Sequence, residues 1–336
     1  MKVFEFRLKP TSDFATELQG DCLFGQICWQ FAQDNSLAGN ITNLLAEYDT
    51  NPFCVVADPC LTFEKDGRHE YLLKMPFFKR CHEQNENEKN DFEQQKRHYL
   101  ERKRKKSFKW VIVSENMKLN LFDETNLVDA KIVKTRYGCP EEWRIIKATR
   151  QTHNSINRLT GTTGTGAFAP YTSNIFSWPP KTEFALFIGI RDDIEANAVG
   201  EALRRIGITG YGADASTGKG RFEVISQPVA VDLSLFGSQT PDSLYVLSPI
   251  LPETGIYEKV CFEPFVRFGR HGNILATSNA PFKQPVLKAA TGAILTPEKN
   301  KWPMRLFIGK SINGISKHKA TVEQGYALFI PVKSEA

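Results

Sequence analysis

Glycines, hydroxyls and cations gather in one segment, residues 209–223, which reads T-G-Y-G-A-D-A-S-T-G-K-G-R-F-E. Glycine has no Cβ, so its backbone adopts angles that other residues resist and lets another backbone come close. Ser216 and Thr217 add hydroxyl donors, and Lys219 and Arg221 add cationic ones. A loop built in this way suits the phosphate oxygens of a nucleotide or of a nucleic-acid backbone.

The spacing of this segment argues against a mononucleotide or dinucleotide site. A Walker loop has four residues between its first glycine and its Gly-Lys pair, followed by Ser or Thr. Here five residues separate Gly212 from Gly218, and Gly220 follows Lys219. A Rossmann loop follows a strand and opens a helix, whereas this loop is expected to follow a helix and open a strand. A glycine-rich surface connection without a ligand is the alternative interpretation.

The composition is that of a globular protein. The chain has 336 residues, of which 41% are hydrophobic and 24% are charged, and this length predicts two domains. It has no apolar run of about 18 residues and no signal-peptide pattern, so we expect a cytoplasmic protein with no membrane contact. The seven cysteines lack a framework spacing and predict reduced thiols. Because no C-x-x-C pair occurs, we expect neither a metal site nor a cofactor.

Charge is distributed unevenly, although the net charge is only +5. The segment Lys96 to Lys109 holds eight Lys or Arg residues and a single acid, Glu101, and the segment Glu83 to Glu93 just before it is acidic. Such a run is typical of a solvated or disordered insertion. The alternative is an electrostatic contact, and the sequence leaves open whether the basic segment would contact RNA or protein.

Hydrophobic spacing predicts the elements that would position the glycine-rich loop. Strands are expected where apolar residues alternate or cluster, and helices where they recur every three or four residues. Asp21 is expected to cap the first helix, and Gly207 to end the second. The expected elements are a strand at 2–9, a helix at 21–31, a strand at 53–57, a hairpin at 61–73, a strand at 184–190, a helix at 193–206 and a strand at 221–225.

This order predicts an α+β fold of the ferredoxin-like (RRM-like) type over residues 1–228. A long irregular insertion, at about 77–180, is expected to carry a thumb-like hairpin and the basic segment. Residues 229–336 read as a second, β-rich domain, a degenerate ferredoxin-like unit. Its strands are expected at 244–247, 260–268, 306–308 and 327–332.

Several motifs occur together in one order along most of the chain. They are G-D-C-L-F-G at 20–25, V-V-A-D at 55–58, H-N-S-I-N-R-L-T-G at 153–161, the glycine-rich loop ending in G-K-G-R-F, and terminal motifs at 281–286 and 325–331. Together they resemble the RAMP superfamily of CRISPR proteins, and within it the family of the fourth subunit of the Csm (type III-A) complex, in the Cas-five group. Cys22 stands where that family usually has Thr, and Ala57 where Ser is commoner. A relative in another type III complex, such as Cmr, is the alternative.

The resemblance implies a non-catalytic subunit of an RNA-guided interference complex. Such a subunit would bind the 5′ tag of the crRNA and bridge the large Cas-ten-type subunit to a backbone RAMP subunit that cleaves target RNA, so its own contact with target RNA would be indirect. The glycine-rich loop would hold the tag, and the projecting hairpin would kink the guide. The candidate RNA-binding residues are Gly210, Gly212, Ser216, Thr217, Gly218, Lys219, Gly220, Arg221, Arg158, Thr160 and Phe168.

Each candidate also has a structural interpretation. Lys219 and Arg221 could be phosphate ligands or merely exposed cations. Arg158 could contact RNA or form a salt bridge. Phe168 and Tyr171 could stack on bases or pack a mobile loop. Trp29 is expected on the core side of the first helix.

His153 carries the alternative function, a metal-independent RAMP endoribonuclease that processes precursor crRNA. A histidine beside a base or cation can activate the 2′ hydroxyl of RNA and protonate the leaving oxygen. No partner His or Tyr stands at a recognisable spacing from it in the sequence. A hydrogen-bonded loop histidine is therefore the favoured interpretation. A general RNA-binding module outside CRISPR is the third candidate.

Overall fold

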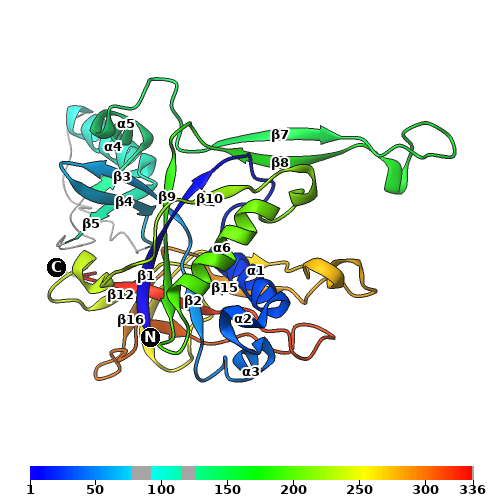
Figure 1. Ribbon diagram of the computed structural model, residues 1–336. Coiled ribbons are helices and arrows are strands. Elements are labelled where there is room, and N and C mark those ends of the chain that lie inside the picture. The colour runs from blue at the N-terminus through cyan, green and yellow to red at the C-terminus, as the bar shows by residue number, and fades with distance from the viewer. Residues whose placement is uncertain (78–91, 116–125, 335–336) are drawn as a thin grey trace.

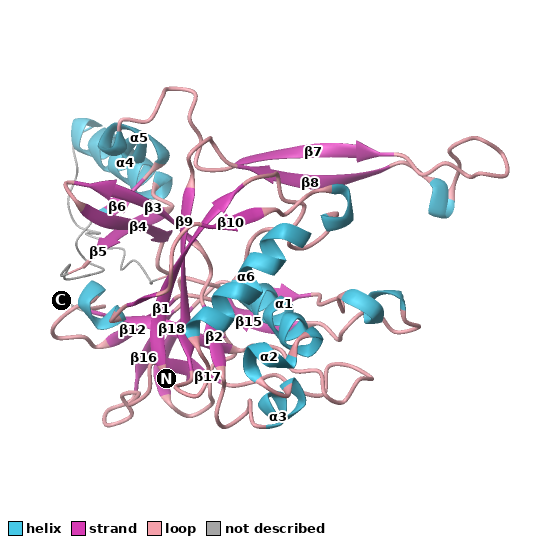
Figure 2. Ribbon diagram, viewed as in Figure 1, coloured by secondary structure: helices cyan, strands magenta, loops and turns pink. Residues whose placement is uncertain are grey.

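The computed structural model describes residues 1–77, 92–115 and 126–334 and shows a sheet-rich α+β protein (Figures 1 and 2). Its main sheet runs in the order β10-β1-β9-β3-β4-β5-β6, with β11 paired to β1 and β2 paired to β9. The strands of this sheet are β1 (Lys2–Pro10), β2 (Cys54–Val56), β3 (Cys60–Lys65), β4 (Arg68–Lys74), β5 (Trp110–Ser114), β6 (Leu127–Val128), β9 (Glu183–Ile190), β10 (Phe222–Val224) and β11 (Val229–Ala230).

Two amphipathic helices, α1 (Gly20–Gln33) and α6 (Ala196–Thr209), contact each other beside this sheet (Figure 1). The apolar side of α1 is fully buried, as its spacing predicts, whereas Trp29 is only half-buried and lies against Gly272. The expectation that Trp29 belongs to the core is therefore wrong. The short helices α2 (Asn35–Ala38) and α3 (Ile41–Ala46) follow α1.

The predicted hairpin at 61–73 is confirmed as β3 and β4. It turns at Asp66 and Gly67, whose φ values of 52° and 72° lie in the left-handed region. Two consecutive residues with positive φ give the turn whose twist matches the flanking strands, which is why Asp-Gly marks such hairpins.

The segment expected to be irregular is ordered over much of its length, so that expectation is wrong. Strands β5 and β6 extend the main sheet, and two helices, α4 (Phe92–Ser107) and α5 (Ala130–Tyr137), accompany them. Tyr137 stacks on Phe63 of β3 with ring centroids 4.0 Å apart, which joins α5 to the sheet. The basic segment Lys96 to Lys109 is mostly the helix α4, whereas most of the acidic segment Glu83 to Glu93 lies outside the described residues.

A long two-stranded hairpin projects from the body of the molecule (Figure 1). It consists of β7 (Lys147–His153) and β8 (Tyr171–Ser177), paired from Lys147 opposite Ser177 to His153 opposite Tyr171. Most of its side chains are exposed.

The C-terminal residues form a five-stranded sheet in the order β13-β16-β12-β18-β17 and a separate β14–β15 ladder. The strand expected at 260–268 is interrupted: β13 ends at Cys261 and β14 begins at Pro264, because proline has no N–H to donate to a continuous ladder. The strands are β12 (Ser243–Val246), β13 (Tyr257–Cys261), β14 (Pro264–Arg267), β15 (Val286–Ala289), β16 (Ile294–Pro297), β17 (Phe307–Gly309) and β18 (Tyr326–Val332).

A buried ionic cluster joins the first helix to the C-terminal strands. Asp21 does not cap α1: the capping position is Gln19, whose side chain makes no capping bond. Instead, Asp21 Oδ2 lies 2.9 Å from Lys288 Nζ, and Asp21 Oδ1 lies 2.6 Å from Arg267 Nη2. Lys288, whose side chain is 0% exposed, also lies 2.6 Å from Glu323 Oε1. Burial opposes ionisation of Asp21, but the charges of Lys288 and Arg267 prevail and lower its pKa.

A second carboxyl, the half-buried Asp58, lies at the start of the same helix. Its Oδ1 accepts the backbone N–H of Gly20 at 2.7 Å, and its Oδ2 accepts the hydroxyl of Thr291. Burial without a cationic partner raises the pKa of Asp58 to about 7.

The Asp58→Asn variant tests this pKa. The folded protein holds a proton on Asp58 that the unfolded chain has lost between about pH 4 and 7, so this group destabilises the fold as pH rises through that window. Asparagine retains one acceptor for Gly20 and offers an N–H to Thr291. We expect the stability of the variant relative to wild type to rise between pH 4 and 8 by at most about 4 kcal/mol, at about 1.4 kcal/mol per pKa unit. Urea unfolding at several pH values measures this, and a pH-independent difference would contradict it.

Candidate nucleic-acid interface

The glycine-rich loop connects α6 to β10, as the sequence predicts. The helix begins at Ala196 and ends at Thr209, three residues later at each end than expected. Gly207 therefore does not stop α6. It lies inside the helix, where a Cβ would stand 2.1 Å from the carbonyl oxygen of Phe222, and Gly210, with φ of 100°, follows the last turn.

Most of the glycines in the loop allow another part of the same chain to pack closely against them. A Cβ at Gly210 would lie 2.5 Å from the Lys219 carbonyl oxygen, and one at Gly220 only 2.0 Å from the Tyr211 carbonyl oxygen. A Cβ at Gly212 would meet the side chain of Thr16. At Gly218 nothing lies within 4 Å. Three of the four candidate glycines thus shape the loop, and Gly218 is the one that leaves space for another molecule.

The segment after β1, residues 11–14, joins the loop to the projecting hairpin. Gly220 N donates to the carbonyl of Asp13 at 2.8 Å, and Arg221 N donates to the hydroxyl of Ser12 at 2.9 Å. On the other side, Phe14 and Phe176 of β8 exchange two backbone hydrogen bonds of 2.8 Å. The base of the hairpin and the loop are therefore held together by one short piece of chain.

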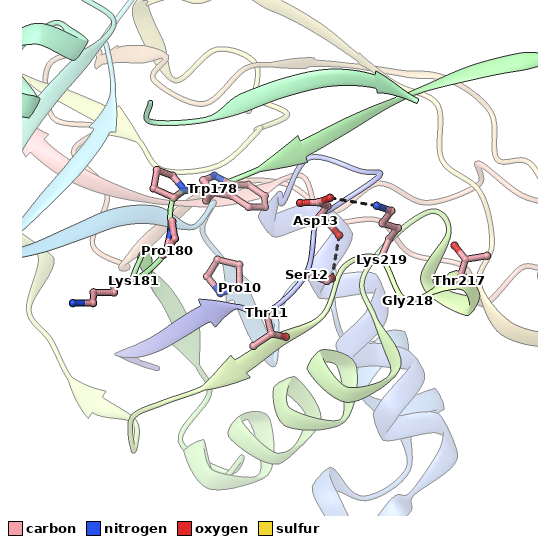
Figure 3. A pocket seen from close by; sticks show the side chains of 11 residues that line it. Pro10, Thr11, Ser12, Asp13, Trp178, Pro180, Lys181, Thr217, Gly218 and Lys219 are labelled. Carbon is pink, nitrogen blue, oxygen red and sulfur yellow. Dashed lines mark hydrogen bonds and ion pairs between the residues drawn. The ribbon is translucent and has the colours of Figure 1, made fainter. Parts of the chain in front are cut away.

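A groove of about 470 Å³ lies where these three pieces meet. Figure 3 shows Trp178, Pro180 and Lys181, from the connection between β8 and β9, on one side, and Asp13 and Lys219 on the other. The lining residues are Pro10, Thr11, Ser12, Asp13, Trp178, Pro179, Pro180, Lys181, Thr217, Gly218 and Lys219.

The electrostatics of the groove combine one internal ion pair with open donors. Lys219 Nζ lies 3.4 Å from Asp13 Oδ2, both side chains being partly exposed, so this pair contributes little to stability. Thr217 and Lys181 of the lining are exposed, and so are Ser216 and Arg221, which are chain neighbours of lining residues but do not line the groove themselves. In the described part of the chain, no hydrogen bond or ion pair engages the guanidinium of Arg221. The groove therefore offers cations and hydroxyls to an anion that can displace one carboxylate.

The side chain of Tyr211 fixes the first part of the glycine-rich loop to the body of the protein. Its ring is fully buried and its hydroxyl donates to the Glu17 carbonyl and accepts the N–H of Gln19. Burial raises its pKa well above the usual value, so the phenol remains a donor. Cys22 also contributes no charge, because burial raises the pKa of its thiol to about 12.

The remaining RNA-binding candidates lie away from this groove. Arg158, Thr160 and Phe168 are exposed and belong to the segment 154–170 at the outer end of the hairpin (Figure 1). The structure does not bring them beside the glycine-rich loop. A single long strand of nucleic acid would be needed to contact both.

His153 lies at the outer end of β7. Its Nε2 lies 2.8 Å from the hydroxyl of Ser173, and its ring stacks on Tyr171, with centroids 5.0 Å apart and planes 12° from parallel. The contact between His153 and Tyr171 was not predicted, because the two residues meet through strand pairing across the hairpin. The arrangement supplies a ring stack and a hydroxyl contact, and among the residues that the structure describes no cation or carboxylate is placed at the imidazole.

Sequence reasoning missed much of the groove: Thr11 and Asp13 follow the first strand, and Trp178 and Lys181 precede the strand β9. These residues stand in the sequence as the polar run P-T-S-D at 10–13 and the run W-P-P-K at 178–181. Nothing in the spacing of either run connects it to the glycine-rich loop at 209–223.

Among the described residues, no group of three or more His, Cys, Asp or Glu side chains is placed to hold a metal ion. None of the helices in the described ranges is long and apolar enough to cross a membrane. The described cysteines are free thiols.

Comparison with solved structures shows that the fold is similar to that of chains in type III-A CRISPR complexes. No protein-family model and no curated protein matches the chain. The chain is similar to a chain of the crystal structure of a Csm3-Csm4 subcomplex of the type III-A CRISPR-Cas interference complex, with a TM-score of 0.53 at 13% identity over 98% of this chain and 99% of that one. It is also similar to a chain of a Csm1-Csm4 cassette in complex with AMPPNP, with a TM-score of 0.54 at 13% identity over 99% of both chains.

A further structure of the Csm1-Csm4 cassette, in complex with pppApA, gives a TM-score of 0.52 at 13% identity over 99% of both chains. Csm4 is the subunit that both kinds of complex contain. The chain thus has a Csm4-like fold along essentially its whole length, which agrees with the order of motifs in the sequence.

Alanine at Gly220 and at Gly218 tests the two roles of the glycines. We expect Gly220→Ala to lower the free energy of unfolding by roughly 3 kcal/mol, because its Cβ would collide with the Tyr211 backbone at a positive φ. Gly218→Ala should cost only about 1 kcal/mol, from the φ of 93° alone. Urea unfolding measures both, and equal losses would show that Gly220 is not a close-approach site.

Proposed function

We propose that this protein is a non-catalytic subunit of a type III CRISPR RNA-guided complex that holds the 5′ tag of the crRNA in the groove beside the glycine-rich loop. The observation that carries the proposal is the meeting of that loop and the base of the projecting hairpin at one groove. The Csm4-like fold supplies the context.

The chemistry of the groove suits a sugar-phosphate backbone. Gly218 leaves room for a close approach, and Lys219 and Arg221 offer charge-assisted hydrogen bonds. Trp178 gives the opposite wall an aromatic edge for a sugar or base. The hairpin then extends away from the groove, and Phe168 and Tyr171 expose aromatic surface along it. A guide leaving the groove would meet them in turn.

The strand order β10-β1-β9-β3 with α1 and α6 is the arrangement that we interpret as a ferredoxin-like unit, with β5, β6 and the hairpin inserted between its third and fourth elements. In this interpretation the loop before the last strand is a recognition loop beside the sheet. The chain would also bridge a large Cas-ten-type subunit and a backbone RAMP subunit. Copurification with both, together with a short guide RNA, would support that role.

Lys219→Ala combined with Arg221→Ala tests the groove. We expect the double variant to bind a tag-bearing RNA more weakly. Its logarithmic salt slope should become shallower by about 1.4, since each single-strand phosphate contact contributes about 0.7. Fluorescence anisotropy across a salt series measures both. Arg68→Ala with Lys131→Ala, two exposed cations on β4 and α5, is the matched control, and an equal effect there would overturn the proposal.

Asp13→Asn should act in the opposite direction. The carboxylate competes with phosphate for Lys219, so its neutralisation should strengthen RNA binding several-fold at low salt. The same anisotropy titration detects this, and weaker binding would mean that Asp13 positions Lys219 for RNA instead.

The absence of ribonuclease activity is part of the proposal. Repeat RNA incubated with the protein in EDTA should stay intact on a denaturing gel. His153 stacks on Tyr171 and contacts only a hydroxyl at Nε2, which leaves no charged partner to share the proton transfers. Specific cleavage that disappears in His153→Ala would establish the ribonuclease instead.

A further inference from the structure

A second exposed surface has the chemistry of a single-stranded RNA site. It is the lobe formed by residues 264–289, which contain β14 and β15, together with the loop 310–322; we call it the basic lobe. Neither segment contains an Asp or a Glu. A lobe with exposed cations and no acids of its own favours an anionic partner.

The two segments of the basic lobe are packed into one unit. Gln284 N donates to the carbonyl of Ile315 at 2.8 Å, and His271 Nε2 lies 2.8 Å from the hydroxyl of Ser316. The rings of His271 and His318 meet edge to face with centroids 5.3 Å apart. The loop 310–322 is thereby fixed beside the β14–β15 ladder, and its Lys317 and Lys319 remain exposed.

The hairpin of the lobe has distinct inner and outer faces. Beyond the β14–β15 ladder, Arg270 pairs with Phe282 across the hairpin, and His271 N donates to the carbonyl of Pro281. Alternation along a strand puts successive side chains on opposite faces. His271 is buried and Lys283 reaches to within 3.8 Å of Glu323, so these two side chains belong to the inner face.

The outer face carries two exposed rings and a cation. Phe268 is 74% exposed and Phe282 68% exposed. The guanidinium of Arg270 stands 5.6 Å from the ring centroid of Phe282. Phe268 stands two residues before Arg270, so alternation along the chain puts its ring on the face of Arg270 and of Phe282, the residue bridged to Arg270. Val266 and Leu287, also exposed, continue this face toward the body.

The lobe is connected to the groove through α1. Arg267 at the end of β14 binds Gln19, whose backbone N–H donates to the hydroxyl of Tyr211 under the glycine-rich loop. In Figure 1 the lobe and the β7–β8 hairpin extend toward the same side of the molecule.

We propose that the basic lobe binds single-stranded RNA, with bases stacked on the Phe268 and Phe282 rings of its outer face and phosphates held by Arg270 there and by Lys317 and Lys319 of the loop 310–322. Stacking platforms of aromatic rings beside cations bind single strands with little sequence preference. Flat rings with a guanidinium beside one of them suit bases and phosphates better than they suit a broad apolar protein surface. Such a surface would bury the charge of Arg270, whose guanidinium donates to the Ala276 carbonyl at 3.1 Å, without a counter-charge. The inference rests on the proposed function only in taking the bound strand to be part of the same guide RNA.

The test uses the whole protein and two RNA probes of about 12 nucleotides, within the range of single-strand site sizes. One is oligoadenylate, and the other is an abasic oligomer with the same phosphates. We expect Phe268→Ala with Phe282→Ala to weaken oligoadenylate binding about 10-fold or more while leaving abasic binding and the salt slope unchanged. Lys317→Ala with Lys319→Ala should instead weaken both probes and make the slope shallower.

Matched variants separate stacking from other effects. Leucine at positions 268 and 282 keeps apolar surface without a flat ring, so this variant should bind oligoadenylate as weakly as the alanine variant does. Tryptophan at the same two positions should bind it as the wild type does. Trp302→Ala removes an exposed aromatic from the loop between β16 and β17, outside the basic lobe, and should not change RNA binding. Wild-type affinity in the leucine variant would overturn the inference. So would unchanged RNA binding in the alanine variant accompanied by lost binding to a partner subunit, which would make the lobe a protein-docking surface.

The two proposals fail in different ways. If the Lys219 and Arg221 double variant binds normally while the phenylalanine variant does not, the groove proposal fails and the lobe stands. If the phenylalanine variant binds both probes normally while the groove variant does not, the lobe proposal fails alone.

Discussion

The buried ammonium of Lys288 is the interaction on which the arrangement of the two sheets depends. It is surrounded by Asp21 of α1, Glu323 just before β18 and the carbonyl of Gln324, and Arg267 balances the remaining charge on Asp21. Removing a charge from water is costly, and removing one partner from such a cluster leaves another charge uncompensated. The first helix and the C-terminal strands are therefore held in one relative position.

That fixed position determines where the glycine-rich loop can lie. The side chain of Gln324, which is fully buried, forms hydrogen bonds with both the N–H and the carbonyl of Val56 in β2. The C-terminal segment is therefore also hydrogen-bonded to the main sheet. Gln19 then links Arg267 to Tyr211, and the loop closes around that tyrosine. The groove and the basic lobe are thus two ends of one hydrogen-bonded structure, although the residues that form them are far apart in the chain.

Most of the glycines in the loop are needed for a different physical reason from the one that the sequence suggested. The sequence suggested that they let a nucleic-acid backbone approach. In the folded chain, Gly210, Gly212 and Gly220 instead accommodate the protein's own carbonyls and the Thr16 side chain. Gly218 alone of this set faces open space. Glycines that look alike in the sequence therefore have two different roles: three allow the close packing of the loop, and one leaves space beside it.

Helix and strand positions followed from local periodicity wherever one face of an element is buried, as in β9 and α6. The ends of these helices and strands were predicted less accurately. Asp21 had the appearance of a cap because its partner charges lie about 250 and more residues away. The strands β5 and β6 were missed inside an insertion whose charge dominated its composition. In both cases a distant partner, and not the local pattern, decided the outcome.

By itself, the sequence determined the α+β character, the hairpin at Asp66, the helix–loop–strand order around the glycines and the likeness to one class of CRISPR subunits, because these depend on spacing within short windows. Only the tertiary structure decided that Asp13 and Trp178 share a groove with Lys219, and that Phe268 and Phe282 both stand exposed in the basic lobe. Such neighbours arise from strand pairing and buried charge compensation between remote segments, and no local pattern carries that information.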